Sequence, residues 1–464
     1  MKRQTLLFIF LLLSTLVASA YDAKIDGVYY NLDTGTKQAT VTCLSTDYKQ
    51  NQNAYTGSVT IPASVAYNGV TYSVTSIGRY AFMGCGKLTS VIIPNSVTSI
   101  EEAAFILCIG LKDVTIGNNV TSIGKLAISG CGSLTSVTIP NGVTAIGERA
   151  FDGCSNLKDI TVPNSVTSIG GGAFNGTAWY DSQLDGMVYI GKIAYKYKGT
   201  MPKNTYISIE EGTLALAGGV FSKCINLKSV SIPNSVKIIR GGAFEYCSGL
   251  TSVTIPNSVT ELGGGVFLNC TGLTEITIPN SVTIIGEGIL ANCTSLTSVT
   301  VGNNVKRIEN NAFYGCSGLT SVIIPDCVET IGKNVFKGCY KLRSVTIPTN
   351  MKTIGEEAFA YSGITSVIIP SGVEAIGSNA FQACIYLTSL TIPNSMKTIG
   401  VNAFKDCSRL TKVNCYAEQV PMASSYTFDK TARTTLCVPE ASMEAYKTTA
   451  PWSKFGVIKK LPLK

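Results

Sequence analysis

The residues of this chain with the most obvious chemistry are its 16 cysteines, since thiols form disulfides, bind metals and act as nucleophiles. The 464 residues include no histidine, which excludes Ser-His-Asp and Cys-His catalysis, imidazole metal sites and histidine pH switches. Carboxylate pairs could serve a hydrolase, but Glu101–Glu102, Glu210–Glu211 and Glu356–Glu357 would point to opposite faces of a strand. We therefore expect no catalytic residue, cofactor or metal, and no enzymatic activity.

Twelve of the cysteines occupy one position of a repeat, three residues after a large apolar residue. An even cysteine count in an exported chain would favour disulfides. Parallel side chains on adjacent coils do not supply the disulfide dihedral, however, and zinc needs ligands that converge on one point rather than a row. We predict a ladder of buried, free thiols. Its members are Cys85, Cys108, Cys131, Cys154, Cys224, Cys247, Cys270, Cys293, Cys316, Cys339, Cys384 and Cys407.

The element that positions this ladder is a repeat of 23 residues, L-x-x-V-x-I-P-x-x-V-x-x-I-G-x-x-A-F-x-x-C-x-x. One such coil cannot bury its own apolar residues, but stacked coils share a continuous core. The alternation in L-x-x-V-x-I predicts a strand, which the proline ends, and the glycine suits a turn with positive φ or close backbone packing. We predict a β-rich solenoid of about fourteen rungs with parallel strands. The aromatic position marks the rungs at Phe82, Phe105, Ile128, Phe151, Phe174, Phe221, Phe244, Phe267, Leu290, Phe313, Phe336, Phe359, Phe381 and Phe404.

The two ends of the chain depart from the repeat. Lys2 and Arg3, the apolar run 6–17 and the small residues 18–20 predict a secretory signal peptide, because the run is too short to span a bilayer. The chain is therefore expected to be exported, to the medium, the cell surface or the periplasm, with no membrane span after cleavage. The predicted divisions are a signal peptide at 1–20, an N-terminal β cap at 21–72, a solenoid at 73–412 with a hairpin insertion at 175–212, and a C-terminal cap at 413–464.

The consensus, with I-P, V-x-x-I-G and A-F-x-x-C in that order over residues about 74–412, resembles the BspA-type leucine-rich repeats of bacterial surface and secreted proteins. G-V-Y-Y-N-L near the start and L-C-V-P near the end resemble the caps of that family. The resemblance implies an exported recognition protein without enzymatic activity, in some members an adhesin for host extracellular-matrix or plasma proteins. It also implies that the ladder position, often Asn or Cys in leucine-rich repeats, is bonded to the backbone of its turn.

The outward side chains of the strands form the first candidate binding surface. Serine and threonine dominate two columns there, giving a flat polar face of the kind that solenoids use to bind proteins. The alternative is that threonine is simply a soluble strand former, since the columns lack the Trp, Tyr and Arg anchors of usual hot spots. The candidate residues are Ser136, Thr138, Ser229, Ser231, Ser252, Thr254, Glu275, Thr277, Ser298 and Thr300.

The insertion forms the second candidate. Its alternation predicts a β-hairpin that turns at Gly191-Lys192, and its aromatics with nearby lysines are typical interface material. The alternative, which we favour, is that these aromatics pack on the flank of the solenoid. The candidate residues are Trp179, Tyr189, Tyr195 and Tyr197.

The charges give little guidance. Lys and Arg exceed Asp and Glu by 37 minus 29, a net charge of +8, without a basic run interleaved with aromatics, so no nucleic-acid partner is expected. The leading hypothesis is a binding protein that recognises a host or bacterial protein or a glycan through the solenoid face. The alternative is a structural spacer of the cell envelope without a specific ligand.

Four cysteines lie outside the ladder: Cys43, Cys327, Cys415 and Cys437. The sequence leaves their redox state open, and a disulfide between Cys415 and Cys437 is plausible.

Overall fold

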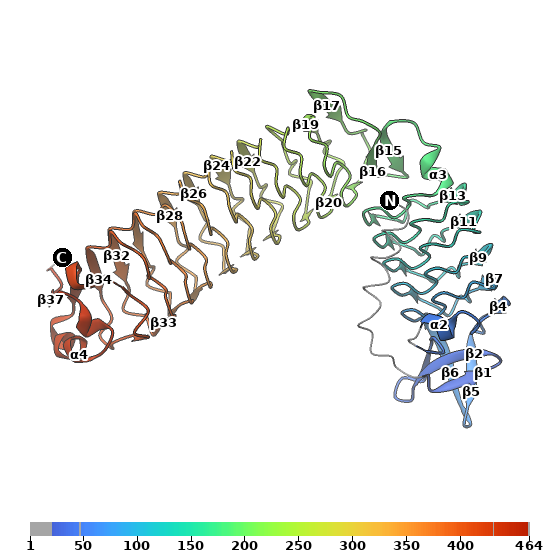
Figure 1. The fold of residues 1–464 in the computed structure, drawn as a ribbon, viewed down its shortest axis with the longest axis horizontal. Coiled ribbons are helices and arrows are strands. Elements are labelled where there is room, and N and C mark those ends of the chain that lie inside the picture. The colour runs from blue at the N-terminus through green and yellow to red at the C-terminus, as the bar shows by residue number, and fades with distance from the viewer. Residues whose placement is uncertain (1–20, 46–47, 430, 463–464) are drawn as a thin grey trace. The chain divides into compact units, whose positions relative to one another are not determined.

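The computed structural model describes residues 21–45, 48–429 and 431–462, so the expected signal peptide lies outside the described residues. The chain divides into two compact units, here unit 1 and unit 2, with the boundary between Lys198 and Gly199. In each unit the chain winds into a coil of short parallel strands (Figure 1), which confirms the predicted solenoid. Over the described residues the coil makes about 17 turns rather than about fourteen, because segments flanking the repeat also coil.

Each rung begins with the L-x-x-V-x-I segment. In β24 (Ser298–Thr300) Val299 is buried while Ser298 and Thr300 are exposed, as the two-residue period of a strand requires. Neighbouring strands pair in parallel, with Glu275 opposite Ser298. We call the outward side of this row the strand face. In unit 1 it comprises β4 (Gly57–Thr60), β7 (Leu88–Ile92), β9 (Asp113–Thr115), β11 (Ser136–Thr138) and β13 (Asp159–Thr161). In unit 2 it comprises β17 (Thr205–Ser208), β19 (Leu227–Ser231), β22 (Glu275–Thr277), β24, β26 (Ser321–Ile323), β28 (Ser344–Thr346), β30 (Ser366–Ile368), β32 (Ser389–Ile392), β34 (Lys412–Cys415), β36 (Thr435–Val438) and β37 (Val457–Lys460).

A second row of two-residue strands forms where the repeat reads I-G. A Cβ added to Gly147 would lie 2.5 Å from the carbonyl carbon of Gly124 on the preceding rung. Close backbone packing, rather than positive φ, therefore requires this glycine. The row comprises β8 (Ser99–Ile100), β10 (Ser122–Ile123), β12 (Ala145–Ile146) and β14 (Ser168–Ile169) in unit 1. In unit 2 it comprises β18 (Ala215–Leu216), β20 (Ile238–Ile239), β21 (Glu261–Leu262), β23 (Ile284–Ile285), β25 (Arg307–Ile308), β27 (Thr330–Ile331), β29 (Thr353–Ile354), β31 (Ala375–Ile376), β33 (Thr398–Ile399) and β35 (Met422–Ala423).

The core of the coil is a stack of aromatic rings. Phe336 lies between Phe313 and Phe359, with ring centroids 5.2 and 5.4 Å apart and nearly parallel planes. Ile128 and Leu290 take the same buried position in two rungs. Because each ring is covered by its neighbours above and below, stacking rungs buries apolar area that a single rung would expose.

The flanking segments extend these rows. At the start of unit 1, β4 pairs with β7, and the ring of Tyr55 lies 4.4 Å from that of Phe82. At the end of unit 2, β36 and β37 pair in parallel beyond β34, and Phe428 stacks on Phe404 at 5.3 Å. The other elements of these segments are β1 (Ala23–Ile25), β2 (Val28–Asp33), β3 (Gln38–Val41), α2 (Tyr48–Asn51), β5 (Ser64–Tyr67) and β6 (Val70–Ile77), and α4 (Met443–Thr448) with 3-10 turns at Thr431–Arg433, Glu440–Ser442 and Trp452–Lys454.

The insertion in unit 1 forms the predicted hairpin. Strands β15 (Gly186–Ile190) and β16 (Ile193–Lys198) pair antiparallel across the turn at residues 191–192, after the short helix α3 (Ala178–Asp181). The hydroxyl of Tyr195 accepts a hydrogen bond from the backbone N–H of Phe174 at 2.9 Å. Through this buried tyrosine the hairpin covers the last aromatic ring of the stack in unit 1.

Candidate binding surfaces

The cysteine ladder lies inside the coil. Each of its bonded thiols donates to a backbone carbonyl, as from Cys131 to Phe105 at 3.2 Å and from Cys247 to Phe221 at 3.0 Å. The acceptor is usually the residue at the aromatic position of the preceding rung, which is Ile128 for Cys154 and Leu290 for Cys316, so the thiol ties one rung to the next. Cys85 donates instead to the Asn51 carbonyl. All 16 cysteines, which lie within the described residues, are free, and the predicted ladder of buried, free thiols is found except that Cys224 is half-buried.

The same burial makes these thiols poor nucleophiles and poor ligands. Burial raises the pKa of Cys270 and of Cys316 to about 12, so both stay protonated at neutral pH. Among the described residues no group of three or more Cys, Asp or Glu side chains is arranged to hold a metal ion. The ladder thiols therefore contribute to the fold through hydrogen bonds between successive rungs.

The cysteines off the ladder are also accounted for by local bonds. Cys327 is half-buried and donates to the Val305 carbonyl at 3.2 Å, just as Ser258, three repeats earlier, donates to the Val236 carbonyl. The Cys415 thiol lies 3.2 Å from the Tyr446 hydroxyl. Cys437 stands opposite Asn414 across β34 and β36, and so on the other side of the sheet from Cys415. The plausible disulfide between Cys415 and Cys437 is thus not formed.

The strand face carries the predicted columns. Of the ten candidate residues, Ser136 and Thr138 lie in unit 1 and the others in unit 2. All are exposed except Ser229, which is half-buried, and Ser252 and Thr254 lie in a stretch between β19 and β22 that is not a strand. The structure brings the unit 2 members into one outward row. Two isoleucines interrupt this polar row, Ile323 and Ile368, each 73% exposed.

The hairpin candidates are mostly engaged with the solenoid. Tyr195 is buried, and the Trp179 ring packs edge-on against Phe174 at 5.6 Å. Tyr189 and Tyr197 are half-buried on the two strands. The favoured interpretation, in which the hairpin aromatics pack on the coil, therefore describes Trp179 and Tyr195.

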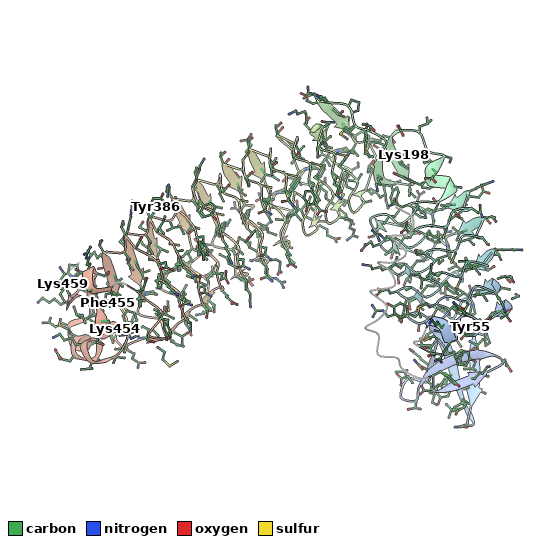
Figure 2. The ribbon with its side chains drawn as sticks, viewed as in Figure 1. Tyr55, Lys198, Tyr386, Lys454, Phe455 and Lys459 are labelled. Atoms are coloured by element: carbon green, nitrogen blue, oxygen red, sulfur yellow. The ribbon has the colours of Figure 1, made fainter. Side chains whose placement is uncertain are left out.

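A basic cluster that sequence reasoning missed lies at the C-terminal end of the strand face. The guanidinium groups of Arg343 and Arg409 lie 4.3 and 5.2 Å from the centre of the Tyr386 ring. Figure 2 places Tyr386 beside the row of strands and Lys459 on the last strand of unit 2. The available signal was substitution within the consensus, since Arg343 replaces the usual threonine and Lys412 the usual serine.

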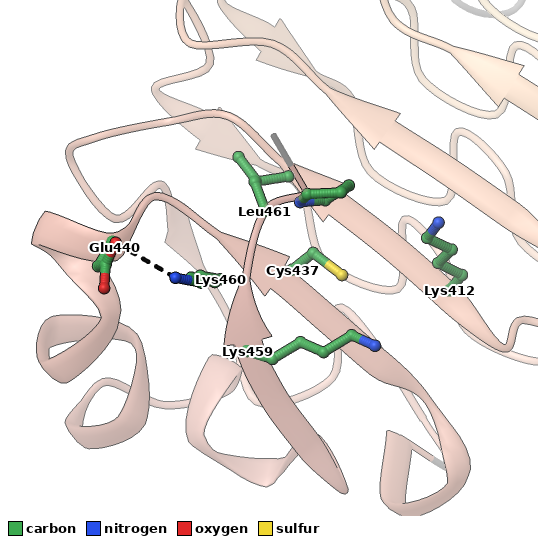
Figure 3. Close-up of a pocket in the computed structure, with 7 residues that line it drawn as sticks. Lys412, Cys437, Glu440, Lys459, Lys460 and Leu461 are labelled. Atoms are coloured by element: carbon green, nitrogen blue, oxygen red, sulfur yellow. Dashed lines mark ion pairs between the residues drawn. The ribbon is translucent and has the colours of Figure 1, made fainter. Parts of the chain in front are cut away.

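A hollow of about 640 Å³ adjoins this cluster at the end of the strand face. Lys412, Cys437, Lys459 and Lys460 line it from β34, β36 and β37, and Glu440, Leu461 and Pro462 complete its wall (Figure 3). Lys460 and Glu440 form an ion pair at the wall of the hollow, with the Lys460 ammonium group 3.9 Å from the Glu440 carboxylate. The hollow thus presents the side chains of Lys412 and Lys459 together with the Lys460–Glu440 ion pair.

Comparison with known proteins gives one family. A model of the BspA type leucine rich repeat region matches residues 75–201, 188–320 and 306–435. Solved structures similar to the chain include a leucine-rich repeat protein from Bacteroides ovatus, 30% identical, with 90% of this chain and all of that one covered and a TM-score of 0.44. A leucine rich cell surface protein from Faecalibacterium prausnitzii is 29% identical over 86% and 96% of the two chains, with a TM-score of 0.36. None of the curated proteins compared with the chain matches it significantly.

Proposed function

The chain belongs to the BspA-type leucine-rich repeat family, and from that membership we propose that it is an exported bacterial recognition protein whose strand face binds a protein or a glycan. The partners proposed are host extracellular-matrix or plasma proteins, or glycans of host or bacterial surfaces. Nucleic acids are not proposed as partners, and no catalytic activity is proposed.

The observation that carries this proposal is the exposed strand face of unit 2. From β22 to β34 its outward residues are short and mostly polar, and they project from backbone held by parallel pairing. Little side-chain entropy is lost when a partner covers serine and threonine, and the rigid scaffold holds its contact groups in place before binding. A regular, extended face of this kind is how solenoid proteins generally engage other macromolecules.

Export rests on the pattern of residues 1–20, with basic residues, an apolar run and small residues before position 21. Among the described residues, no helix has the length and apolar character needed to cross a lipid bilayer. The proposal of a non-enzymatic role is supported by the protonated state of the buried thiols, which removes the most reactive groups of the chain from chemistry.

The test is a binding screen with the chain from residue 21 onward, immobilised and exposed to matrix proteins, plasma proteins, and neutral and acidic glycans. We expect saturable retention of at least one of them. The same chain carrying Thr277→Lys and Thr300→Lys, which place two long cations on the strand face, should lose that retention. Retention of none of the probes, with the chain fractionating into the cell envelope, would instead favour a structural spacer.

A further inference from the structure

Four cations at the C-terminal end of the strand face lie close together without a carboxylate partner among the described residues, whereas several other cations of unit 2 are paired. On another side of the coil, lysines pair with glutamates one rung away, as Lys333 does with Glu356 at 2.8 Å and Lys397 with Glu374 at 2.6 Å. These pairs cancel charge along the other sides of the coil. Among the described residues, no carboxylate lies in ion-pair range of Arg343, Arg409, Lys412 or Lys459, which we call the basic strip.

The basic strip follows the order of the rungs. Arg343 precedes β28 and Arg409 precedes β34, and both reach the ring of Tyr386, which precedes β32. Lys412 lies on β34, and Lys459 lies on β37 two strands further on. At about 4.8 Å between neighbouring strands, the strip extends over ~24 Å from the rung of Arg343 to that of Lys459. A ligand that contacts all four cations must therefore be an elongated polyanion.

The hollow gives the strip a defined contact point. Its volume of about 640 Å³ falls within the range of about 300–1,000 Å³ that is usual for ligand sites. Cys437 and Lys459 are cross-strand partners, which places the Lys459 ammonium group at the same side of the sheet as the hollow (Figure 3). An anionic group seated there would meet Lys412 from one strand and Lys459 from another, beside the Glu440 carboxylate, which is paired with Lys460.

The neighbours of the cations point to a sugar polymer. Ser389 and Thr391 are half-buried on β32, two strands before β36, and their hydroxyl groups can bond to sugar hydroxyls. The guanidinium groups of Arg343 and Arg409 already lie over the Tyr386 ring, so the ring is not free to stack on a nucleic-acid base. The guanidinium group of arginine and the ammonium group of lysine both form charge-assisted hydrogen bonds with the oxygen atoms of sulfates and carboxylates.

We propose that the basic strip binds an acidic polysaccharide bearing sulfate or carboxylate groups, with one anionic group in the hollow between Lys412 and Lys459. This inference rests on the proposed strand-face recognition and names the ligand class for one end of that face. Binding is electrostatic in origin and weakens steeply as salt rises, because cations of the protein replace counterions of the polymer.

The test measures affinity of the chain from residue 21 onward for heparin as the sulfated probe, over a range of NaCl concentrations. The triple variant Arg409→Gln, Lys412→Gln and Lys459→Gln should bind at least about tenfold more weakly near physiological salt. Its slope of log affinity against log salt should fall by about 3, one for each cation removed. The matched control is Lys112→Gln, Lys158→Gln and Lys203→Gln, which removes the same charge from exposed positions outside the strip and should change affinity less than twofold.

Equal weakening in the two triple variants would overturn the proposal, because it would show a response to net charge alone. Equal binding of neutral dextran, or stronger competition by single-stranded DNA or polyglutamate of matched charge than by heparin, would also overturn it. If the chain retains a neutral glycan or a protein but not heparin, strand-face recognition stands and the basic strip proposal fails. If it retains none of these probes, both fail. Melting temperatures of both variants check that the fold is intact.

Discussion

The interior and the strand face of unit 2 are made by the same rungs, but they differ in how much each rung is free to vary. Inside, rings from Phe313 to Phe428 stack at centroid distances between 5.1 and 5.4 Å. Outside, equivalent strand positions hold Ser298, Glu275 and Lys412. An interior side chain must fill a space fixed by two neighbours, whereas an outward one meets water. The interior therefore specifies the fold, and the strand face is free to specify a ligand.

The largest effect expected from this contrast is alkaline unfolding through the ladder. The pKa is raised in ten of its thiols, chiefly by burial in nine and by a hydrogen bond with Cys131 in Cys154. Below the reference pKa of 9.0 both states are protonated and the thiols leave the stability unchanged with pH. Between pH 9 and about 12 the unfolded chain loses protons that the folded chain keeps, so stability falls by roughly 1 kcal/mol per thiol from pH 9 to pH 10.

Urea unfolding at pH 8 and pH 10 measures this loss. The variant with Cys270→Ala and Cys316→Ala should start less stable at pH 8 but lose about 3 kcal/mol less between the two pH values. The same urea midpoint for the unaltered chain at both pH values would show that the thiols do not keep their protons inside the coil.

The next largest effect is that of a single ring. Phe336→Ala removes a side chain enclosed between two others and should cost about 3–5 kcal/mol in the free energy of unfolding, measured by urea denaturation. Phe336→Leu is the control, because Leu290 occupies this position in another rung. A leucine variant as unstable as the alanine variant would contradict the view that the stack needs volume more than aromaticity.

A third substitution tests backbone contact between rungs. Gly147→Ala would place a methyl group 2.5 Å from the backbone of Gly124 and Lys125 and should cost about 1–3 kcal/mol, because that backbone is held by its own rung. At Gly132 the nearest atom to an added Cβ is the Ser155 hydroxyl at 3.7 Å, so Gly132→Ala is a matched control with a change below about 0.5 kcal/mol. Comparable melting temperatures for the two variants would refute this assignment.

The same contrast explains how much could be predicted from the sequence. The interior was predictable because its residues recur in every repeat, so the buried aromatic residue, the ladder cysteine and the two-residue period of the strand each appear many times in the sequence. The count of turns fell short because the flanks keep inward residues, such as Val413 and Leu436, without the consensus around them. The basic strip was not predicted, because Arg409 and Tyr386 occupy a position that varies between rungs, the substitution at Arg343 occurs once, and only the stacking of rungs brings both arginines to Tyr386.

The smallest effect on stability is expected on the strand face, where it is most informative. Thr277→Lys with Thr300→Lys alters exposed side chains on β22 and β24 and should change the free energy of unfolding by less than about 0.5 kcal/mol per site. The control, Thr260→Lys with Thr283→Lys, adds the same charges beside the two-residue strands on another side of the coil. If the strand face binds, only the first variant loses its ligand in the retention assay, while both unfold at the same urea concentration. Loss of retention in both variants would show that retention depends on net charge and not on the strand face. Loss of stability in the strand-face variant would show that the strand face also stabilises the fold.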